Sequence, residues 1–477
     1  MSDYGQSDGT DRDHGGKSGK RAFQVTRSEP TRAYVLVPWL KSAEHDARRK
    51  GVPIRSAETQ LEEAVGLAHA IDLNIVGRSV VSLQAVRPST LVGEGKLEEL
   101  KGEIAALDVE LVVVDNALTP VQQRNLERAW KVKVLDRTGL ILEIFGERAN
   151  TREGALQVEL AHLNYQKSRL VRSWTHLERQ RGGLGFVGGP GETQIEADRR
   201  MLQERITKLE RQLETVKRTR ELHRKTRRDA PYPVVALVGY TNAGKSTLFN
   251  RVTEAGVFAE NLLFATLDPT MRSIELPSGR KVILSDTVGF ISDLPTHLVA
   301  AFRATLEEVL EAQLIIHVRD ASHEETEIQK ADVEKVLASL GVTPETMSAN
   351  DQHILEVLNK LDRLPAEQAD ALRNMAERDP DTLAMSALTG EGVETLLRRI
   401  DDLVTDDAHY IAVDLLADEG EALAWLYRNS DVREREDRED GSIRLRVGLA
   451  PAAMGRFEKH FPDIARRAGE LLAEAAE

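Results

Sequence analysis

Residues 234–246 read Val234-Val-Ala-Leu-Val-Gly-Tyr-Thr-Asn-Ala-Gly-Lys-Ser246. The first five residues are an apolar run typical of a buried strand, and the other eight match the phosphate-binding pattern G-x-x-x-x-G-K-[ST]. Thr247-Leu-Phe-Asn250 then suits a helix. A strand, a glycine-rich loop and a helix in this order surround phosphate oxygens with backbone N–H groups at the positive end of the helix dipole. The stretch therefore predicts an α/β domain that binds a nucleotide.

Each polar group of this loop has an expected role. Lys245 is expected to reach the β- and γ-phosphates, and the Ser246 hydroxyl is expected to hold Mg²⁺. The residues expected to contact the nucleotide here are Gly239, Tyr240, Thr241, Asn242, Ala243, Gly244, Lys245, Ser246 and Thr247.

A second motif, Asp286-Thr287-Val288-Gly289, follows the strand-like residues 282–285. An acid at the end of a strand with glycine three residues later suits a phosphate-sensing loop. Asp286 would reach the Mg²⁺ shell through water, and the Gly289 N–H would face the γ-phosphate. With Lys245, Gly289 is a candidate catalytic residue.

Two further motifs predict which base is bound. Asn359-Lys360-Leu361-Asp362 follows a strand-like run, and the Asp362 carboxylate can accept hydrogen bonds from N1–H and the 2-amino group of guanine. Adenine lacks this pair of donors, so the site is expected to prefer GTP to ATP. The stem of Lys360 would pack along the ring. Ser386-Ala387-Leu388 would supply a backbone N–H to guanine O6.

Between these motifs lies the stretch 263–270, which reads Leu-Phe-Ala-Thr-Leu-Asp-Pro-Thr. A switch loop needs a threonine that ligates Mg²⁺ and becomes ordered when GTP binds. Thr266 and Thr270 both have the required hydroxyl, and the spacing alone does not choose between them.

On the N-terminal side, residues 33–146 alternate between strand-like and helix-like segments, which favours βαβ units around a mostly parallel sheet. We therefore expect an N-terminal α/β domain at 32–150, preceded by a disordered tail at 1–31. The GTPase domain is expected at 230–405. Strand and helix patterns predict a small C-terminal α+β domain at 406–477, with residues 431–440 as an exposed loop.

In residues 151–229 the spacing of apolar residues changes, and the new pattern predicts a long antiparallel helical hairpin. Apolar residues recur at a 3.5-residue spacing on both sides of a glycine-rich break, 182–191. They are Leu156, Leu160, Leu163, Leu170, Trp174 and Leu177 in the first arm and Leu202, Ile206, Leu209, Leu213 and Val216 in the second.

Charge is distributed unevenly along the 477 residues. The net charge is −14, which by itself argues against a nucleic-acid partner. However, residues 199–228 hold twelve Lys and Arg against four Glu, a net of +8, which leaves −22 for the rest. This basic segment of the hairpin suits phosphate contact. The chain has no cysteine and no recognisable signal or membrane segment, so we expect a cytoplasmic protein that does not insert into membranes.

Several motifs together resemble the HflX family of translational GTPases, which are related to the Obg proteins. The resemblance runs from about Ala33 into the C-terminal region, and it is carried by the GTPase motifs and by 91–96 (LVGEGK), 118–125 (LTPVQQRN), 136–143 (DRTGLILE), 151–159 (TREGALQVE) and 188–194 (GGPGETQ).

The resemblance implies a Mg²⁺-dependent GTPase that binds the large ribosomal subunit and its rRNA through the hairpin. Family members can split stalled ribosomes under stress, and a role in subunit biogenesis is an alternative. The resemblance also favours Thr266 over Thr270 as the Mg²⁺ ligand and catalytic switch residue, within a nucleotide-contacting run of Phe264, Ala265, Thr266, Leu267 and Asp268. It further implies that Asn242 can help to hold K⁺. We expect a monomer.

Two positions depart from related patterns. The hairpin loop lacks the basic Thr-Arg pair that many relatives have before Gly-Pro-Gly. Phe290 follows Gly289, where Ras-like proteins place a glutamine that orients water. Because an apolar side chain cannot orient water, we expect slow intrinsic hydrolysis that the ribosome accelerates.

Two other functions remain open on the sequence alone. Gly93-Glu-Gly-Lys96 before a helix could support an ATP-driven RNA remodeller in the N-terminal domain. A GTPase switch that does not act on the ribosome is the other alternative, although the C-terminus lacks a cysteine for prenylation.

Overall fold

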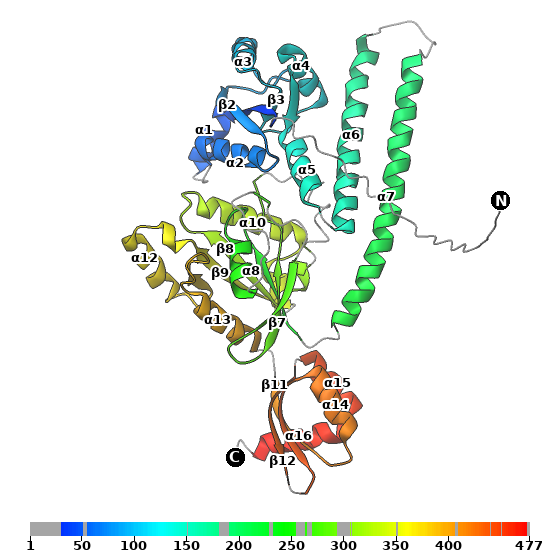
Figure 1. Ribbon diagram of the computed structural model, residues 1–477, viewed down its shortest axis with the longest axis vertical. Helices are drawn as coiled ribbons and strands as arrows, with labels where there is room; N and C mark the ends of the chain where they lie inside the picture. Colours follow the sequence, from blue (N-terminus) through cyan, green and yellow to red (C-terminus); the bar gives the residue numbers. More distant parts are fainter. Residues whose placement is uncertain are drawn as a thin grey trace, which may run out of the picture.

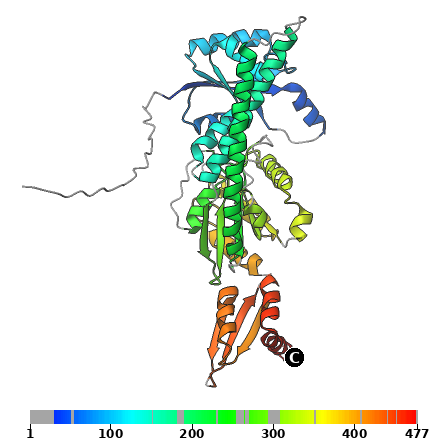
Figure 2. The same cartoon turned by 90° about the vertical axis from the view of Figure 1, so that its right-hand side faces the viewer.

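In the computed structural model of the 477-residue chain, the described residues form three β-sheets, which lie one after another along the long axis of the molecule (Figures 1 and 2). The N-terminal and C-terminal sheets lie at opposite ends, with the largest sheet between them. The structure describes residues 30–50, 55–149, 151–180, 190–228, 232–253, 263–264, 270–292, 306, 308–349, 352–405, 409–438, 440–449 and 451–474. Most of the predicted tail and the 182–189 part of the hairpin loop lie outside these ranges.

The N-terminal sheet has four parallel strands in the order β2-β1-β3-β4. Its strands are β1 (Arg32–Leu40), β2 (Asn74–Leu83), β3 (Leu111–Val114) and β4 (Lys133–Asp136). Its helices are α1 (Lys41–Lys50), α2 (Ala57–His69), α3 (Glu94–Ala106), α4 (Pro120–Trp130) and α5 (Arg137–Arg148). The apolar run Val80-Val-Ser-Leu83 predicts a strand that starts at Val80, but β2 begins six residues earlier, at Asn74. Sequence reasoning missed this start because Gly77 interrupts the apolar pattern. A Cβ at Gly77 would lie 2.5 Å from Cδ2 of Tyr34, so the pairing with β1 needs glycine there.

Two long helices, α6 (Arg152–Gln180) and α7 (Pro190–Arg228), lie side by side and run beside the first two sheets (Figures 1 and 2). With 39 residues, α7 is about 58 Å long. The two helices are joined by polar contacts from Lys167 to Gln203 and from Arg205 to Glu159, and Ile206 and Leu209 are buried.

The central sheet has six strands in the order β10-β9-β8-β5-β7-β6, and only β6 is antiparallel to its neighbour. Its strands are β5 (Val234–Val238), β6 (Thr270–Glu275), β7 (Lys281–Asp286), β8 (Leu314–Asp320), β9 (His353–Asn359) and β10 (Thr382–Ala384). The helices are α8 (Lys245–Thr253), α10 (Thr326–Leu340), α11 (Pro344–Ala349), the 3₁₀ helix η1 (Leu361–Arg363), α12 (Ala366–Ala376) and α13 (Val393–Thr405).

One hydrophobic cluster joins the N-terminal and central sheets. It contains residues of β1, α2 and α5 together with residues of β5, β8 and α10. Tyr240, Phe264 and Phe290, which lie in or beside the predicted nucleotide motifs, belong to the same cluster. The N-terminal domain therefore packs directly against the part of the central domain where the motifs gather.

The C-terminal sheet has three antiparallel strands in the order β11-β13-β12. Its elements are β11 (His409–Leu415), α14 (Gly420–Asn429), β12 (Asp431–Asp437), β13 (Ile443–Leu449), α15 (Pro451–His460) and α16 (Pro462–Glu474). The expectation of a loop at 431–440 is wrong for 431–437, which form β12. The sequence pattern did not predict this strand, because an edge strand with exposed charged side chains of both signs shows little apolar alternation.

Candidate nucleotide site

The loop between β5 and α8 has the geometry that its sequence predicts. Gly239 and Gly244 have positive φ values of +149° and +99°. A Cβ at Gly239 would lie 2.1 Å from the carbonyl oxygen of Val318, and one at Gly244 would lie 2.2 Å from Asn359 Nδ2. The loop can therefore pack against β8 and the end of β9 only because both residues are glycine.

Lys245 lies at the centre of this loop. Its Nζ donates hydrogen bonds to the carbonyl oxygens of Gly239 at 3.1 Å and Tyr240 at 2.9 Å. Burial lowers the pKa of Lys245 to about 8, and the nearby Asp286 carboxylate opposes that shift. The side chain is thus held in place beside the loop, where a phosphate would stabilise its ammonium form.

Oxygen donors suited to Mg²⁺ lie at the start of α8 and the end of β7. The Ser246 hydroxyl donates to Asp286 Oδ2 at 2.7 Å. A hydroxyl and a carboxylate in this arrangement fit a magnesium ion that also uses phosphate oxygens and water. Within the described ranges no group of three His, Cys, Asp or Glu could hold a metal ion.

The predicted switch loop is described only at its edges. Ala265, Thr266, Leu267 and Asp268 lie outside the described residues. Phe264 is buried and packs edge-on against Phe145 of α5, with ring centroids 4.8 Å apart. Thr270 is the first residue of β6 and pairs with Asp286. The choice between Thr266 and Thr270 therefore stays a prediction.

The Asp286–Gly289 segment is bonded to the loop after β5. Thr241 N–H donates to the carbonyl of Phe290 at 2.7 Å, and Phe290 N–H donates to the carbonyl of Gly239 at 3.1 Å. A Cβ at Gly289 would lie 2.9 Å from Thr241 Cα and 3.0 Å from Lys245 Nζ. Gly289 is therefore next to the lysine expected to bind the β- and γ-phosphates. Thr287 and Val288 are buried behind it.

The two base motifs lie together at the ends of β9 and β10. Asn359 Nδ2 donates to the carbonyl of Ala243 at 2.8 Å, which joins this end of the site to the phosphate loop. The Ser386 hydroxyl donates to Asp362 Oδ1 at 2.5 Å and so orients the predicted guanine-binding carboxylate. Leu361 is buried beneath it, and Leu388 is 65% exposed.

Two contacts of the base site were not predicted from the sequence. Within Ser386–Leu388, the Ala387 N–H donates to Asn359 Oδ1 at 2.8 Å, so this N–H has a partner within the protein. Lys360 Nζ pairs with Asp320 Oδ2 at 2.7 Å, which fixes the end of the stem that was expected to cover the ring. Both contacts join distant strand ends, and local sequence gives no sign of them.

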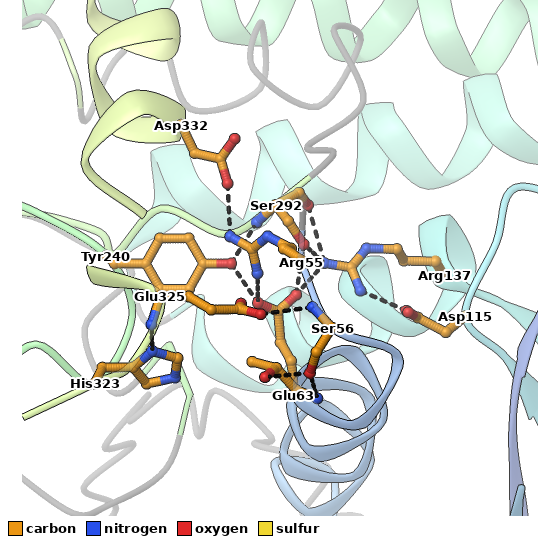
Figure 3. Close-up of polar contacts among 11 residues, drawn as sticks. Arg55, Ser56, Glu63, Asp115, Arg137, Tyr240, Ser292, His323, Glu325 and Asp332 are labelled. Atoms are coloured by element: carbon orange, nitrogen blue, oxygen red, sulfur yellow. Dashed lines mark hydrogen bonds and ion pairs between the residues drawn. The ribbon is translucent and has the colours of Figure 1, made fainter. Parts of the chain in front are cut away.

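Sequence reasoning missed two residues. Arg251 of α8 donates through Nε to the carbonyl of Ala387 at 2.5 Å and also contacts the Leu388 carbonyl, so it supports the loop after β10. Glu63 of α2 accepts a hydrogen bond from the Tyr240 hydroxyl (Figure 3). No local pattern marks Arg251, which is 136 positions from Ala387. No local pattern marks Glu63, which is 177 positions from Tyr240.

The structure does not support the alternative ATP site in the N-terminal domain. Gly93 is the N-cap of α3, and Lys96 Nζ pairs with Glu99 Oε1 at 2.6 Å within that helix. A phosphate loop needs several backbone N–H groups between strand and helix, and here the helix begins at Glu94.

None of the described helices combines the length and the apolar composition that a membrane span requires.

Family models match four consecutive parts of the chain. Their descriptions are GTP-binding GTPase N-terminal (58–146), GTP-binding GTPase Middle Region (148–227), 50S ribosome-binding GTPase (234–360) and HflX C-terminal domain (371–470).

Individual proteins match over most of their length. The GTPase HflX of Magnetococcus marinus is 49% identical over 438 residues, covering 91% of this chain and 96% of that protein. The GTPase HflX of Escherichia coli is 41% identical over 426 residues, covering 88% and 98%. Among solved structures, the SsGBP–GDP complex aligns with 79% of this chain and 99% of that chain, with a TM-score of 0.45 and 24% identity. On the family models and the protein relatives, the chain belongs to the HflX family and is a GTPase.

Proposed function

We propose that the chain binds GTP with Mg²⁺ at the site formed by the β5–α8 loop, Asp286–Gly289, Asn359–Asp362 and Ser386–Leu388, and uses the GTP state to act on the large ribosomal subunit. The action is the splitting or rescue of stalled ribosomes, or a step in subunit biogenesis. The observation that carries the ribosomal part is α7, a long helix with a net charge of +8 between residues 199 and 228.

The proposed roles follow from the contacts in the site. Lys245 binds the β- and γ-phosphates, the Gly289 N–H contacts the γ-phosphate, and Asp362 accepts the two guanine hydrogen bonds. When bound through Ser246 and Thr266, Mg²⁺ would neutralise charge that develops on the phosphate oxygens. Water attacks the γ-phosphorus in line with the leaving β-phosphate oxygen. Asn242 is exposed at the rim of the loop, where its side-chain oxygen can help to hold K⁺.

Slow hydrolysis without the ribosome is part of the proposal. Phe290 is 2% exposed, and its ring belongs to the cluster shared with the N-terminal domain. It therefore offers no polar atom to the attacking water. We expect large ribosomal subunits to raise kcat, and K⁺ to raise it further than Na⁺ does. Steady-state phosphate release, measured with and without subunits in each salt, checks both effects. Maximal turnover without subunits would contradict the proposal.

Several basic side chains of α7 are available for phosphate contact. Four of its basic side chains are exposed and, within the described ranges, have no acidic partner; they are Arg199, Arg200, Lys208 and Arg211. Lys and Arg that neutralise phosphates release counterions, so rRNA binding would weaken steeply as salt rises.

Sedimentation with isolated subunits tests this role. A variant with these four residues changed to Gln should lose binding to the large subunit and show a shallower salt dependence, with GTP binding intact. A matched variant changes four exposed basic residues on other elements to Gln: Arg272, Lys335, Arg378 and Lys459. That control should bind subunits normally. Equal binding by both variants would contradict the role of α7.

A further inference from the structure

We propose that Glu63, a residue of the N-terminal domain, is a positioning residue for the γ-phosphate half of the GTP site. It fixes the phosphate-loop residue Tyr240 and the segment after Gly289 in one arrangement. The inference rests on the proposed nucleotide site, and it concerns how the N-terminal domain controls the response of that site to the third phosphate.

Glu63 lies between two parts of the central domain (Figure 3). Its side chain is only 8% exposed. One carboxylate oxygen, Oε2, accepts from the Tyr240 hydroxyl, and the other, Oε1, accepts from the Ser292 hydroxyl at 2.7 Å. The triangle is closed by the Ser292 N–H, which donates to the Tyr240 hydroxyl oxygen at 2.8 Å. A single buried carboxylate thus joins the phosphate loop to the residue three positions after Gly289.

Two arginines hold the carboxylate in its ionised form. Arg137 contacts Oε1 and is itself paired with Asp115, and Arg55 contacts Oε2 at 2.9 Å and is paired with Asp332. Burial alone would raise the pKa of Glu63, but Arg137, Arg55 and the hydroxyl donors lower it to about 2. The group is therefore an anion throughout the physiological pH range.

Ser292 is held at every polar atom. Its N–H and hydroxyl make two of the three hydrogen bonds of the triangle. Its carbonyl and hydroxyl oxygens also contact Arg137 Nη2, at 2.9 and 2.8 Å. Because Ser292 follows Phe290 and Ile291, which are both buried, the cluster fixes the segment from Gly289 to Ser292.

The predicted switch loop contacts the same face of the N-terminal domain. Phe264 packs on Phe145 of α5. Leu263 lies against α2, where a Cβ at Gly66 would be 3.2 Å from Leu263 Cδ1. Both segments expected to respond to the γ-phosphate therefore meet α2 and α5.

This geometry predicts an effect confined to the triphosphate. The Gly289 N–H has a partner in GTP but none in GDP, so fixing Gly289 lowers the ordering cost of GTP binding alone. Glu63→Gln keeps the shape, but the amide nitrogen cannot accept a hydrogen bond. Whichever way the amide is oriented, the donors on one side lose their acceptor.

The experiment compares the affinities of GDP and of an imido-bridged, non-hydrolysable GTP analogue for the full chain by titration calorimetry. Glu63→Gln should weaken analogue binding about tenfold and change GDP binding less than twofold. Ser292→Ala removes the hydroxyl that donates to Glu63 Oε1 and should give the same selective loss. The double variant should lose little more than either single variant, because both changes break one contact.

Glu325→Gln is the matched control. Glu325 is also a buried carboxylate at this interface, and it accepts from the Ser56 N–H at 2.6 Å (Figure 3). This variant should bind both nucleotides like the natural chain. If Glu63→Gln does not fold, the Ser292→Ala result decides.

Three outcomes separate the possibilities. Selective loss of analogue binding supports the positioning role. Equal loss of both nucleotides, or no loss, overturns it and leaves Glu63 as an interface residue only. Failure of the natural chain to bind GDP would instead count against the proposed nucleotide site.

Discussion

The two ends of the nucleotide site are constructed differently. At the base end, Asn359, Asp362 and Ser386 are held by contacts within the central domain, with Arg251 as a support. At the γ-phosphate end, the segments that include Tyr240, Phe264 and Phe290 pack against α2 and α5 of the N-terminal domain. From this difference we infer that guanine recognition operates independently of the N-terminal domain, whereas the response to the third phosphate depends on it.

The largest expected effect comes from the base end. Asp362→Asn replaces a carboxylate that accepts two hydrogen bonds with an amide that presents a donor to guanine. At about 1.5–3 kcal/mol for each charge-assisted bond, affinity should fall about 100-fold or more. GDP and the GTP analogue should lose affinity equally in calorimetry. Xanthosine diphosphate, which has a carbonyl in place of the 2-amino group, should regain affinity. A loss limited to the analogue would contradict the distinction between the base end and the γ-phosphate end.

The next effect concerns Lys245, which lies where the two ends meet. Its pKa of about 8 means that phosphate binding stabilises the ammonium form and takes up a proton above that pH. Affinity is therefore greatest below pH 8 and is lost as pH rises through that value. We expect GDP and analogue binding to weaken together by about tenfold between pH 7 and pH 9. A pH-independent affinity would contradict this assignment.

A smaller effect should appear only at the γ-phosphate end. Phe145→Leu removes the edge-on contact with Phe264, an arrangement worth about 0.5–1.5 kcal/mol. Analogue binding should weaken about fivefold and GDP binding should hardly change. Phe457→Leu is the matched control, because Phe457 is equally buried but packs on Trp425 in the C-terminal domain. Both variants should lower the melting temperature, and only Phe145→Leu should affect analogue binding. An identical nucleotide response in the two variants would contradict a specific effect of the Phe145–Phe264 contact on analogue binding.

Sequence reasoning located the elements of the central domain well, because each motif lies at a strand end. The strand at 234–238 and the helix after it agree with β5 and α8, and the runs before Asp286 and Asn359 agree with β7 and β9. Apolar periodicity and glycine position are local signals, so they can be read from one sequence.

Contacts between distant segments could not be found in the same way. Glu63 reads as one charge on an amphipathic helix, and only the packing of α2 against the phosphate loop brings it to Tyr240 and Ser292. The bond between Ala387 and Asn359 likewise depends on how two strand ends meet. β12 was missed for another reason, since its charges conceal the backbone pairing with β13.

Hydrogen–deuterium exchange of the full chain can show directly whether the N-terminal domain responds to the γ-phosphate. The measurement compares the GDP complex with the complex of the non-hydrolysable GTP analogue, peptide by peptide. We predict that the analogue slows exchange in 286–292 and also in α2, which is outside the central domain, while peptides covering Asn359–Asp362 and Ser386–Leu388 exchange equally in both complexes. If exchange in α2 is the same in both complexes while 286–292 responds, the N-terminal domain does not share the γ-phosphate end and the account is wrong.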